Sequence, residues 1–158
     1  MRNTMTFQID APVDRVFDFC ADFSTTVPVI SPGSEVTQAS SGPLGVGSVF
    51  LFAHPTGLKG RAEVVQYSPP HTLKVATDWG NGPFTTVTLV GVAEGGGSLV
   101  RVYNDAKPMT RFRWMQPIAW VFAPFARGIE AKANDRYVEY ARKTLEAGPP
   151  GDGGGVPT

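Results

Sequence analysis

The sequence predicts an α+β domain: a curved antiparallel sheet of about seven strands, two short helices after the first strand, and a long C-terminal helix. Two observations lead to this prediction. Runs in which apolar and polar residues alternate, separated by turn residues, occupy the chain from Glu35 to Asp105. Nearer the C-terminus the apolar residues recur at helical spacing. Seven strands are more than one flat layer commonly holds, so we expect the sheet to curve.

The first element is a strand from Thr4 to Ile9, where polar and apolar residues alternate. A helix is expected directly after it, because Pro12 suits the first helical position. The apolar stripe of this helix includes Cys20, which we interpret as a small buried hydrophobic residue. A second short helix or turn is expected over residues 21–27, before Pro28.

Six further strands follow, and glycine or proline turns separate them. Pro69 and Pro70 mark a turn because proline lacks the amide donor that a sheet ladder needs. Asn81-Gly82 suits the tight turn of a hairpin. Strands joined by such short turns pair antiparallel. The predicted strands are Glu35–Ser40, Gly47–His54, Leu58–Tyr67, Thr72–Trp79, Phe84–Val92 and Leu99–Asp105.

The main C-terminal helix is predicted from about Pro124 to Ala147. Pro117 and Pro124 would break a helix interior, so we place a first segment before Pro124 and begin the main helix at or near it. Gly148 is the expected terminator. Residues 1–147 are expected to form one domain, followed by a disordered Gly/Pro-rich tail at 148–158. The helix carries an apolar stripe of Phe125, Ile129, Ala133, Tyr137, Ala141, Tyr140 and Leu145.

Composition argues against several functional classes. The chain has 158 residues and a formal net charge of zero, so it has no general attraction for nucleic acid or for an anionic membrane. One cysteine and two distant histidines argue against a metal site. No run approaches the roughly 18 apolar residues of a membrane span, and the N-terminus lacks the apolar core of a signal peptide. We therefore expect a cytoplasmic protein without a membrane partner, present as a monomer or homodimer.

Three local patterns resemble the START/Bet v 1-like (SRPBCC) superfamily, and within it the bacterial polyketide cyclase/dehydrase branch. They are F-x-I-x-A-P-x-x-x-V-F-D-F at 7–19, V-x-x-Y-S-P-P-x-x-L at 64–73 and R-K-T-L-E at 142–146. The resemblance spans Thr4 to about Ala147. It implies a helix-grip fold, in which the sheet wraps around the long helix and leaves a hydrophobic cavity between them.

The resemblance also implies a function. It indicates a protein that binds a hydrophobic small molecule and uses no cofactor. One alternative is a polyketide cyclase/dehydratase-like protein, and the other is a non-catalytic carrier for a lipid, quinone or aromatic metabolite. Whether the protein catalyses a reaction is left open, because a fold by itself does not fix an activity.

A surplus of large apolar residues is consistent with a ligand cavity, since such sites are mostly apolar with few polar groups. Each of these residues could instead fill the core. The candidate ligand-binding residues are Phe17, Phe50, Phe52, Trp79, Phe84, Phe112, Trp114, Trp120, Phe122, Phe125 and Tyr137.

Three polar residues are candidate catalytic groups. Cyclising or dehydrating a poly-β-ketone requires a donor where enolate charge develops and a base near an acidic methylene. His54, at a strand end, is a candidate base or a solvent-facing turn residue. Arg61 is a candidate cavity cation with Glu63 as its counter-ion, or one half of a surface ion pair.

Asn104 is the third candidate, and its case depends on which strand face is inward. It shares a face of the last strand with Val100 and Val102, whereas Tyr103 lies on the other face. Because apolar burial favours an inward valine face, Asn104 is expected to point into the cavity and Tyr103 away from it.

Overall fold

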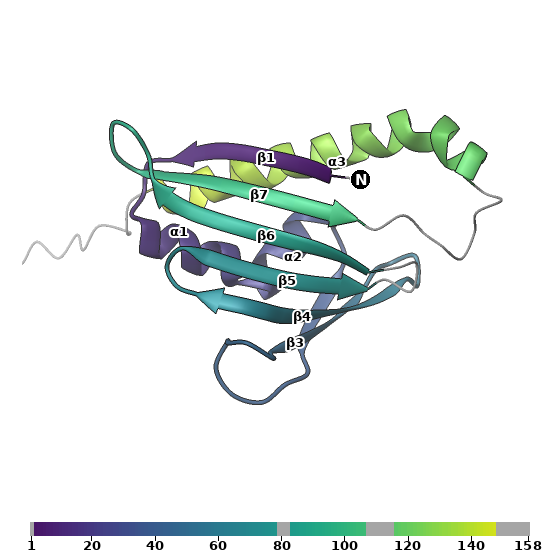
Figure 1. Ribbon diagram of the computed structural model, residues 1–158, viewed down its shortest axis with the longest axis horizontal. Helices are drawn as coiled ribbons and strands as arrows, with labels where there is room; N and C mark the ends of the chain where they lie inside the picture. The colour runs from purple at the N-terminus through teal and green to yellow at the C-terminus, as the bar shows by residue number, and fades with distance from the viewer. Residues whose placement is uncertain (1, 79–82, 107–115, 148–158) are drawn as a thin grey trace, which may run out of the picture.

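Within the residues described by this computed structural model, 2–78, 83–106 and 116–147, the chain forms a seven-stranded antiparallel sheet and three helices (Figure 1). Side chains are described for residues 3–78, 84–105 and 131–147. The strands are β1 (Arg2–Ile9), β2 (Glu35–Gln38), β3 (Val49–Ala53), β4 (Lys59–Ser68), β5 (Thr72–Asp78), β6 (Pro83–Val92) and β7 (Ser98–Ala106). The helices are α1 (Val13–Ala21), α2 (Phe23–Ile30) and α3 (Gln116–Leu145). The predicted fold class and each predicted strand are confirmed.

The sheet is a meander of hairpins with one long-range addition. Its strand order is β1-β7-β6-β5-β4-β3-β2, so β2 to β7 each lie beside their neighbours in the chain. The first strand instead pairs with the last, and Phe7 stands opposite Val100. Both side chains are buried. Burial of apolar side chains on one face therefore fixes this register, because a one-residue slip would turn them to solvent.

The short helices α1 and α2 lie against one face of the sheet (Figure 1). Val16 and Phe17, from the apolar stripe of α1, are fully buried. Asp22 ends α1 and caps α2, since its carboxylate accepts a hydrogen bond from the Thr25 backbone amide at 3.2 Å. The second helix continues through Pro28 to Ile30, beyond the predicted end, because one proline removes only one backbone hydrogen bond.

The third helix is continuous from Gln116 to Leu145, so the predicted break and restart near Pro124 are wrong. Pro117 falls in the first turn, where a missing amide has no intrahelical partner to lose. Pro124 lies inside the helix and removes a single donor. Of the predicted stripe residues whose side chains are described, Tyr137, Ala141 and Leu145 are buried, whereas Ala133 and Tyr140 are partly buried.

The predicted tail at 148–158 and the predicted turn at Asn81-Gly82 lie outside the described residues. Within the described part of the chain, no helix combines the length and apolar character that crossing a membrane requires.

Candidate functional site

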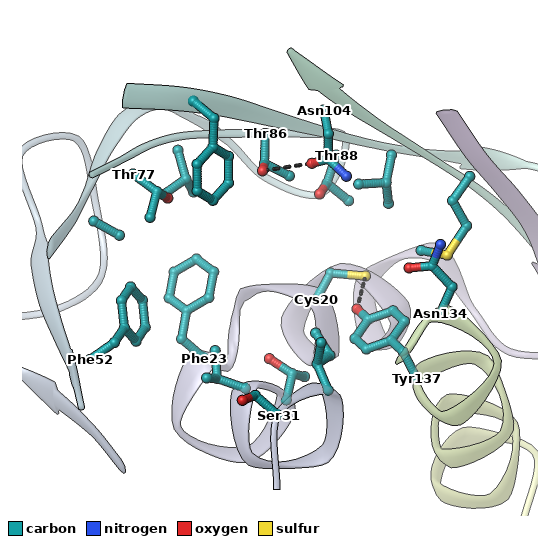
Figure 2. A pocket seen from close by; sticks show the side chains of 18 of the residues that line it. Cys20, Phe23, Ser31, Phe52, Thr77, Thr86, Thr88, Asn104, Asn134 and Tyr137 are labelled. Atoms are coloured by element: carbon teal, nitrogen blue, oxygen red, sulfur yellow. Dashed lines mark hydrogen bonds between the residues drawn. The ribbon is translucent and has the colours of Figure 1, made fainter. Parts of the chain in front are cut away.

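A cavity of about 760 Å³ lies between the inner face of the sheet and the three helices (Figure 2). This volume is within the range of small-molecule sites, which are typically about 300–1,000 Å³. The lining comes from strands β1 and β3 to β7, from all three helices, and from the turn between β3 and β4. The cavity is therefore a product of the whole fold and not of one motif.

The sheet side of the cavity, here called the sheet wall, consists of inward-facing side chains at alternate strand positions. Polar groups interrupt it on β5, β6 and β7. Thr86 and Asn104 stand directly opposite each other on neighbouring strands. The Thr86 hydroxyl donates a hydrogen bond to Asn104 Oδ1 at 2.8 Å (Figure 2). The described residues of the sheet wall are Met5, Phe52, Ala62, Leu73, Val75, Thr77, Phe84, Thr86, Thr88, Val102 and Asn104.

The opposite side, here called the helix wall, is formed mainly by apolar residues of α2 together with Cys20 of α1 and Tyr137 of α3. The Tyr137 hydroxyl donates to Cys20 Sγ at 3.4 Å (Figure 2). Burial raises the pKa of the Cys20 thiol to about 11, only partly offset by this hydrogen bond. Burial also raises the pKa of the Tyr137 phenol well above 10, and the nearby Cys20 acts in the same direction. Both groups are therefore neutral at physiological pH.

The exposed lining residues show where the cavity opens. Ile30, Thr56 and Leu58 line it and are exposed to solvent. They belong to the end of α2 and to the turn between β3 and β4. His54 lies in this turn as well, and its Nδ1 is 2.7 Å from the Thr56 hydroxyl and 3.2 Å from the Thr56 backbone amide.

The hydrogen bonds of this turn assign the His54 tautomer. A backbone amide can only donate, so Nδ1 accepts from Thr56, and the neutral ring carries its proton on Nε2. In this form the other ring nitrogen, Nε2, is a hydrogen-bond donor and not a base.

Among the described lining residues there is no Asp, Glu, Lys or Arg. In the same part of the chain, no group of three or more His, Cys, Asp or Glu side chains is placed to hold a metal ion. The polar groups of these described lining residues are hydroxyls, carboxamides, one thiol and one imidazole. This set can orient a neutral molecule through hydrogen bonds, but it offers no counter-ion to a buried charge.

The structure brings several of the predicted site residues together. His54 and Asn104 line the cavity, and so do Phe52, Phe84 and Tyr137. On β7, Val100 and Val102 are buried whereas Tyr103 is 38% exposed, as the alternation predicts.

Of the two alternatives for Arg61, the structure shows the surface ion pair with Glu63 and not the cavity cation. Arg61 lies on the outer face of β4, with its Nη2 2.9 Å from Glu63 Oε2, and the two side chains are 55% and 40% exposed. Ala62 and Val64 alternate with this pair and are buried. The strand period places the charged residues outside, where they form a surface ion pair.

Phe17 and Phe50 were expected to line the cavity, but they are not among its lining residues. Both are buried in the core, where Phe17 contacts Tyr67 and Phe50 contacts Phe23 edge-on. Trp79, Phe112 and Trp114 lie outside the described residues. The side chains of Trp120, Phe122 and Phe125 are likewise outside the described part of the chain.

The sequence reasoning missed the threonines of the sheet wall. Thr77 belongs to β5, and Thr86 and Thr88 belong to β6. The signal was present for β6, because Phe84 and Val90 fix its inward face and both threonines share that period. For Phe23 and Val27 of α2, no local pattern separates a cavity contact from a core contact.

Comparison with known proteins assigns the chain to a family. The profile of the family described as "Polyketide cyclase / dehydrase and lipid transport" matches residues 2–145. The chain belongs to this family. The START/Bet v 1-like resemblance is thereby confirmed, together with the polyketide cyclase/dehydrase branch. Among curated proteins, no significant match to this chain was found.

Solved structures of the same fold include a protein from Rhodobacter sphaeroides, with a TM-score of 0.63 and 16% identity over 91% of this chain and 93% of that one. A protein from Chromobacterium violaceum aligns with a TM-score of 0.61 and 12% identity, covering 92% and 98% of the two chains. The Bet v 1-like protein Ara h 8.0201 aligns with a TM-score of 0.59 and 13% identity, covering 88% and 98%. At these identities the likeness shows the fold alone.

Proposed function

We propose that this protein binds an uncharged, largely apolar small molecule in the cavity between the sheet and the helices. The observation that carries the proposal is the absence of any charged side chain among the described lining residues of this 760 Å³ cavity. Removing an ion from water without a partner is costly, so the cavity favours neutral ligands. Apolar burial supplies the affinity, at about 25 cal/mol per Å² of surface removed from water.

The family description is consistent with this proposal, since it names polyketide cyclases, dehydrases and lipid transport. All three act on molecules with extensive apolar surface. The state of the titratable groups supports binding ahead of catalysis. Cys20 and Tyr137 are held neutral by burial, and the hydrogen bonds of Thr56 leave His54 as a donor.

Calorimetric titration with fluorenone and with its carboxylate tests the proposal. The two ligands share one tricyclic frame and differ by one charge. We expect fluorenone to bind and the carboxylate to bind at least tenfold more weakly, since charge burial without a partner is unfavourable. Equal affinity for both ligands, or no binding of fluorenone, contradicts the proposal.

A matched pair of variants locates the bound ligand. Ala62→Leu adds bulk to the sheet wall, because Ala62 lines the cavity and is 1% exposed. Ala76→Leu adds the same bulk to β5, at a position that pairs with the outward-facing Glu63. We expect only Ala62→Leu to weaken fluorenone binding. The same loss in both variants would place the ligand elsewhere.

The second candidate function is a cofactor-independent cyclase or dehydratase. It is favoured by the presence of His54 and Asn104 in one cavity, where two hydrogen-bond donors can face the oxygen on which enolate charge develops in a bound poly-β-ketone. Native mass spectrometry with a poly-β-ketone mimic separates this candidate from a carrier. A product lighter by one water, lost in His54→Gln, supports catalysis. A ligand that is bound and recovered unchanged supports the carrier.

A further inference from the structure

The carboxamide of Asn104 is held in one orientation by its neighbour in the sheet. Thr86 Oγ1 lies 2.8 Å from Asn104 Oδ1 and donates to it. Because the hydroxyl occupies the oxygen end of the amide, the NH2 group is the end available to a bound molecule. Asn104 is only partly buried and lines the cavity, so this donor is accessible to a ligand.

Two further hydroxyls on the same wall have no hydrogen-bond partner among the described residues. Thr77 and Thr88 line the cavity and are 7% and 8% exposed. Neither side chain has a hydrogen bond to a described residue, and neither hydroxyl oxygen is fully enclosed. Each oxygen is therefore open to a partner from the cavity, which can be an oxygen atom of a ligand in place of water.

The helix side of the cavity also carries polar groups, namely Thr26, Ser31 and Asn134. Three of its hydroxyls are engaged within the protein: Thr26 donates to the Asp22 carbonyl oxygen at 2.8 Å, Ser31 accepts from Ser34 at 2.8 Å, and Tyr137 donates to Cys20 (Figure 2). Asn134 is the remaining polar group on this side. Among the described lining residues, Asn104 on the sheet wall is the carboxamide whose orientation a hydrogen bond from a neighbouring strand holds.

We propose that Asn104 determines ligand specificity by donating a hydrogen bond from its NH2 group to a carbonyl oxygen, with Thr86 as the residue that positions the amide. The ligand class is a neutral ketone or quinone on a fused or extended apolar frame, with the carbonyl against β6 and β7. Thr88, two residues from Thr86 on the same face, is placed to bond a second oxygen atom in ligands that carry one. This inference rests on the proposed binding function and names the substrate class for it.

The test uses three ligands with the same tricyclic frame: fluorene, fluorenol and fluorenone. Their dissociation constants are measured by calorimetry for the wild type, Asn104→Leu and Thr86→Val. We expect the wild type to bind fluorenone about two- to tenfold more tightly than fluorene, the range that one net hydrogen bond supplies. In Asn104→Leu the two affinities become equal, while fluorene binds as before or better.

Thr86→Val is nearly isosteric and removes the hydroxyl that holds the amide. We expect it to reduce the preference for fluorenone over fluorenol, because the freed amide can turn its oxygen towards an alcohol. Thr85→Val is the matched control, since Thr85 lies on the opposite face of the same strand and does not line the cavity. It should leave all three affinities unchanged.

Three outcomes overturn the inference. If the wild type binds fluorene and fluorenone equally, the cavity binds ligand but Asn104 does not select a carbonyl. If the preference survives in Asn104→Leu, another group is responsible. If fluorenol binds more tightly than fluorenone, the amide presents its oxygen to the ligand. If none of the three ligands binds, the proposed function itself fails, a result distinct from the others.

Discussion

The Tyr137 side chain contributes to stability through the packing of its ring and through the hydrogen bond of its hydroxyl. Replacement of Tyr137 by phenylalanine separates these two contributions. The ring is 8% exposed and packs edge-on against Phe7, with ring centres 5.9 Å apart, and at a tilt against Phe19 at 5.7 Å. The hydroxyl makes one described hydrogen bond, to Cys20 Sγ. Tyr137→Phe keeps the ring contacts and removes only this bond.

The expected cost follows from these contacts. A net hydrogen bond contributes about 0.5–1.5 kcal/mol, and sulfur is a weak acceptor, so we expect Tyr137→Phe to lose about 0.5–1 kcal/mol. Tyr137→Ala removes the ring and leaves a cavity, for which about 3–5 kcal/mol is typical. With a slope of about 2 kcal/mol per molar urea, the midpoints should fall by roughly 0.3–0.5 M and roughly 1.5–2.5 M.

Urea unfolding followed by circular dichroism measures both midpoints. Tyr140→Phe is the matched control, because Tyr140 is half-buried on the same helix and its ring also contacts Phe19. It should shift the midpoint by less than Tyr137→Phe. If Tyr137→Phe costs as much as Tyr137→Ala, the reasoning is refuted, since the hydroxyl and not ring packing would then dominate.

Three further predictions concern the thiol, a turn and the outer face. Because burial raises the pKa of Cys20 from 9.0 to about 11, its contribution to stability is fully present below pH 9 and is lost as the pH approaches 11. Tyr137, whose pKa burial also raises, contributes a further loss above pH 10. The total loss should therefore be smaller in Cys20→Ala by an amount on the order of 2 kcal/mol when unfolding is measured across that range; parallel pH profiles would contradict it. Gly97→Ala should destabilise more than Gly96→Ala in thermal unfolding. Both have positive φ, but only at Gly97 does a Cβ meet a backbone oxygen, at 2.5 Å. Equal losses would show that the close approach is unimportant. Arg61→Gln should change stability by less than about 1 kcal/mol and leave fluorenone affinity unchanged, because its pair with Glu63 is at the surface. A clear loss of affinity would place Arg61 in the binding site after all.

Local periodicity predicted the facing of individual elements. On β7, the alternation of Val100 and Val102 with Arg101 and Tyr103 is a property of strand geometry, so it could be read without knowing the partner strands. The same holds for the burial of Tyr137, Ala141 and Leu145 on α3. Proline positions were less reliable guides, because their cost to a helix is finite and tertiary packing can outweigh it.

The composition of the cavity wall could be predicted only in part. Phe50 and Phe52 are equally apolar and are both buried on the same face of β3, yet Phe52 lines the cavity and Phe50 is in the core. The difference depends on how far each point of the sheet lies from the helices. That distance is set by sheet curvature and by the pairing of β1 with β7, neither of which is a local property.

The sequence by itself determined the order of elements, the fold class, the inward face of β7 and the absence of a net charge that would attract nucleic acid. It did so because these features depend on period, composition and short turns. Only the tertiary structure decided that Thr86 lies opposite Asn104 and orients its amide, that Thr56 fixes the His54 ring, and that Arg61 faces solvent. Each of these features depends on strand register or on a side-chain hydrogen bond. Both are contacts between two residues, and the conformational preference of a single residue does not determine them.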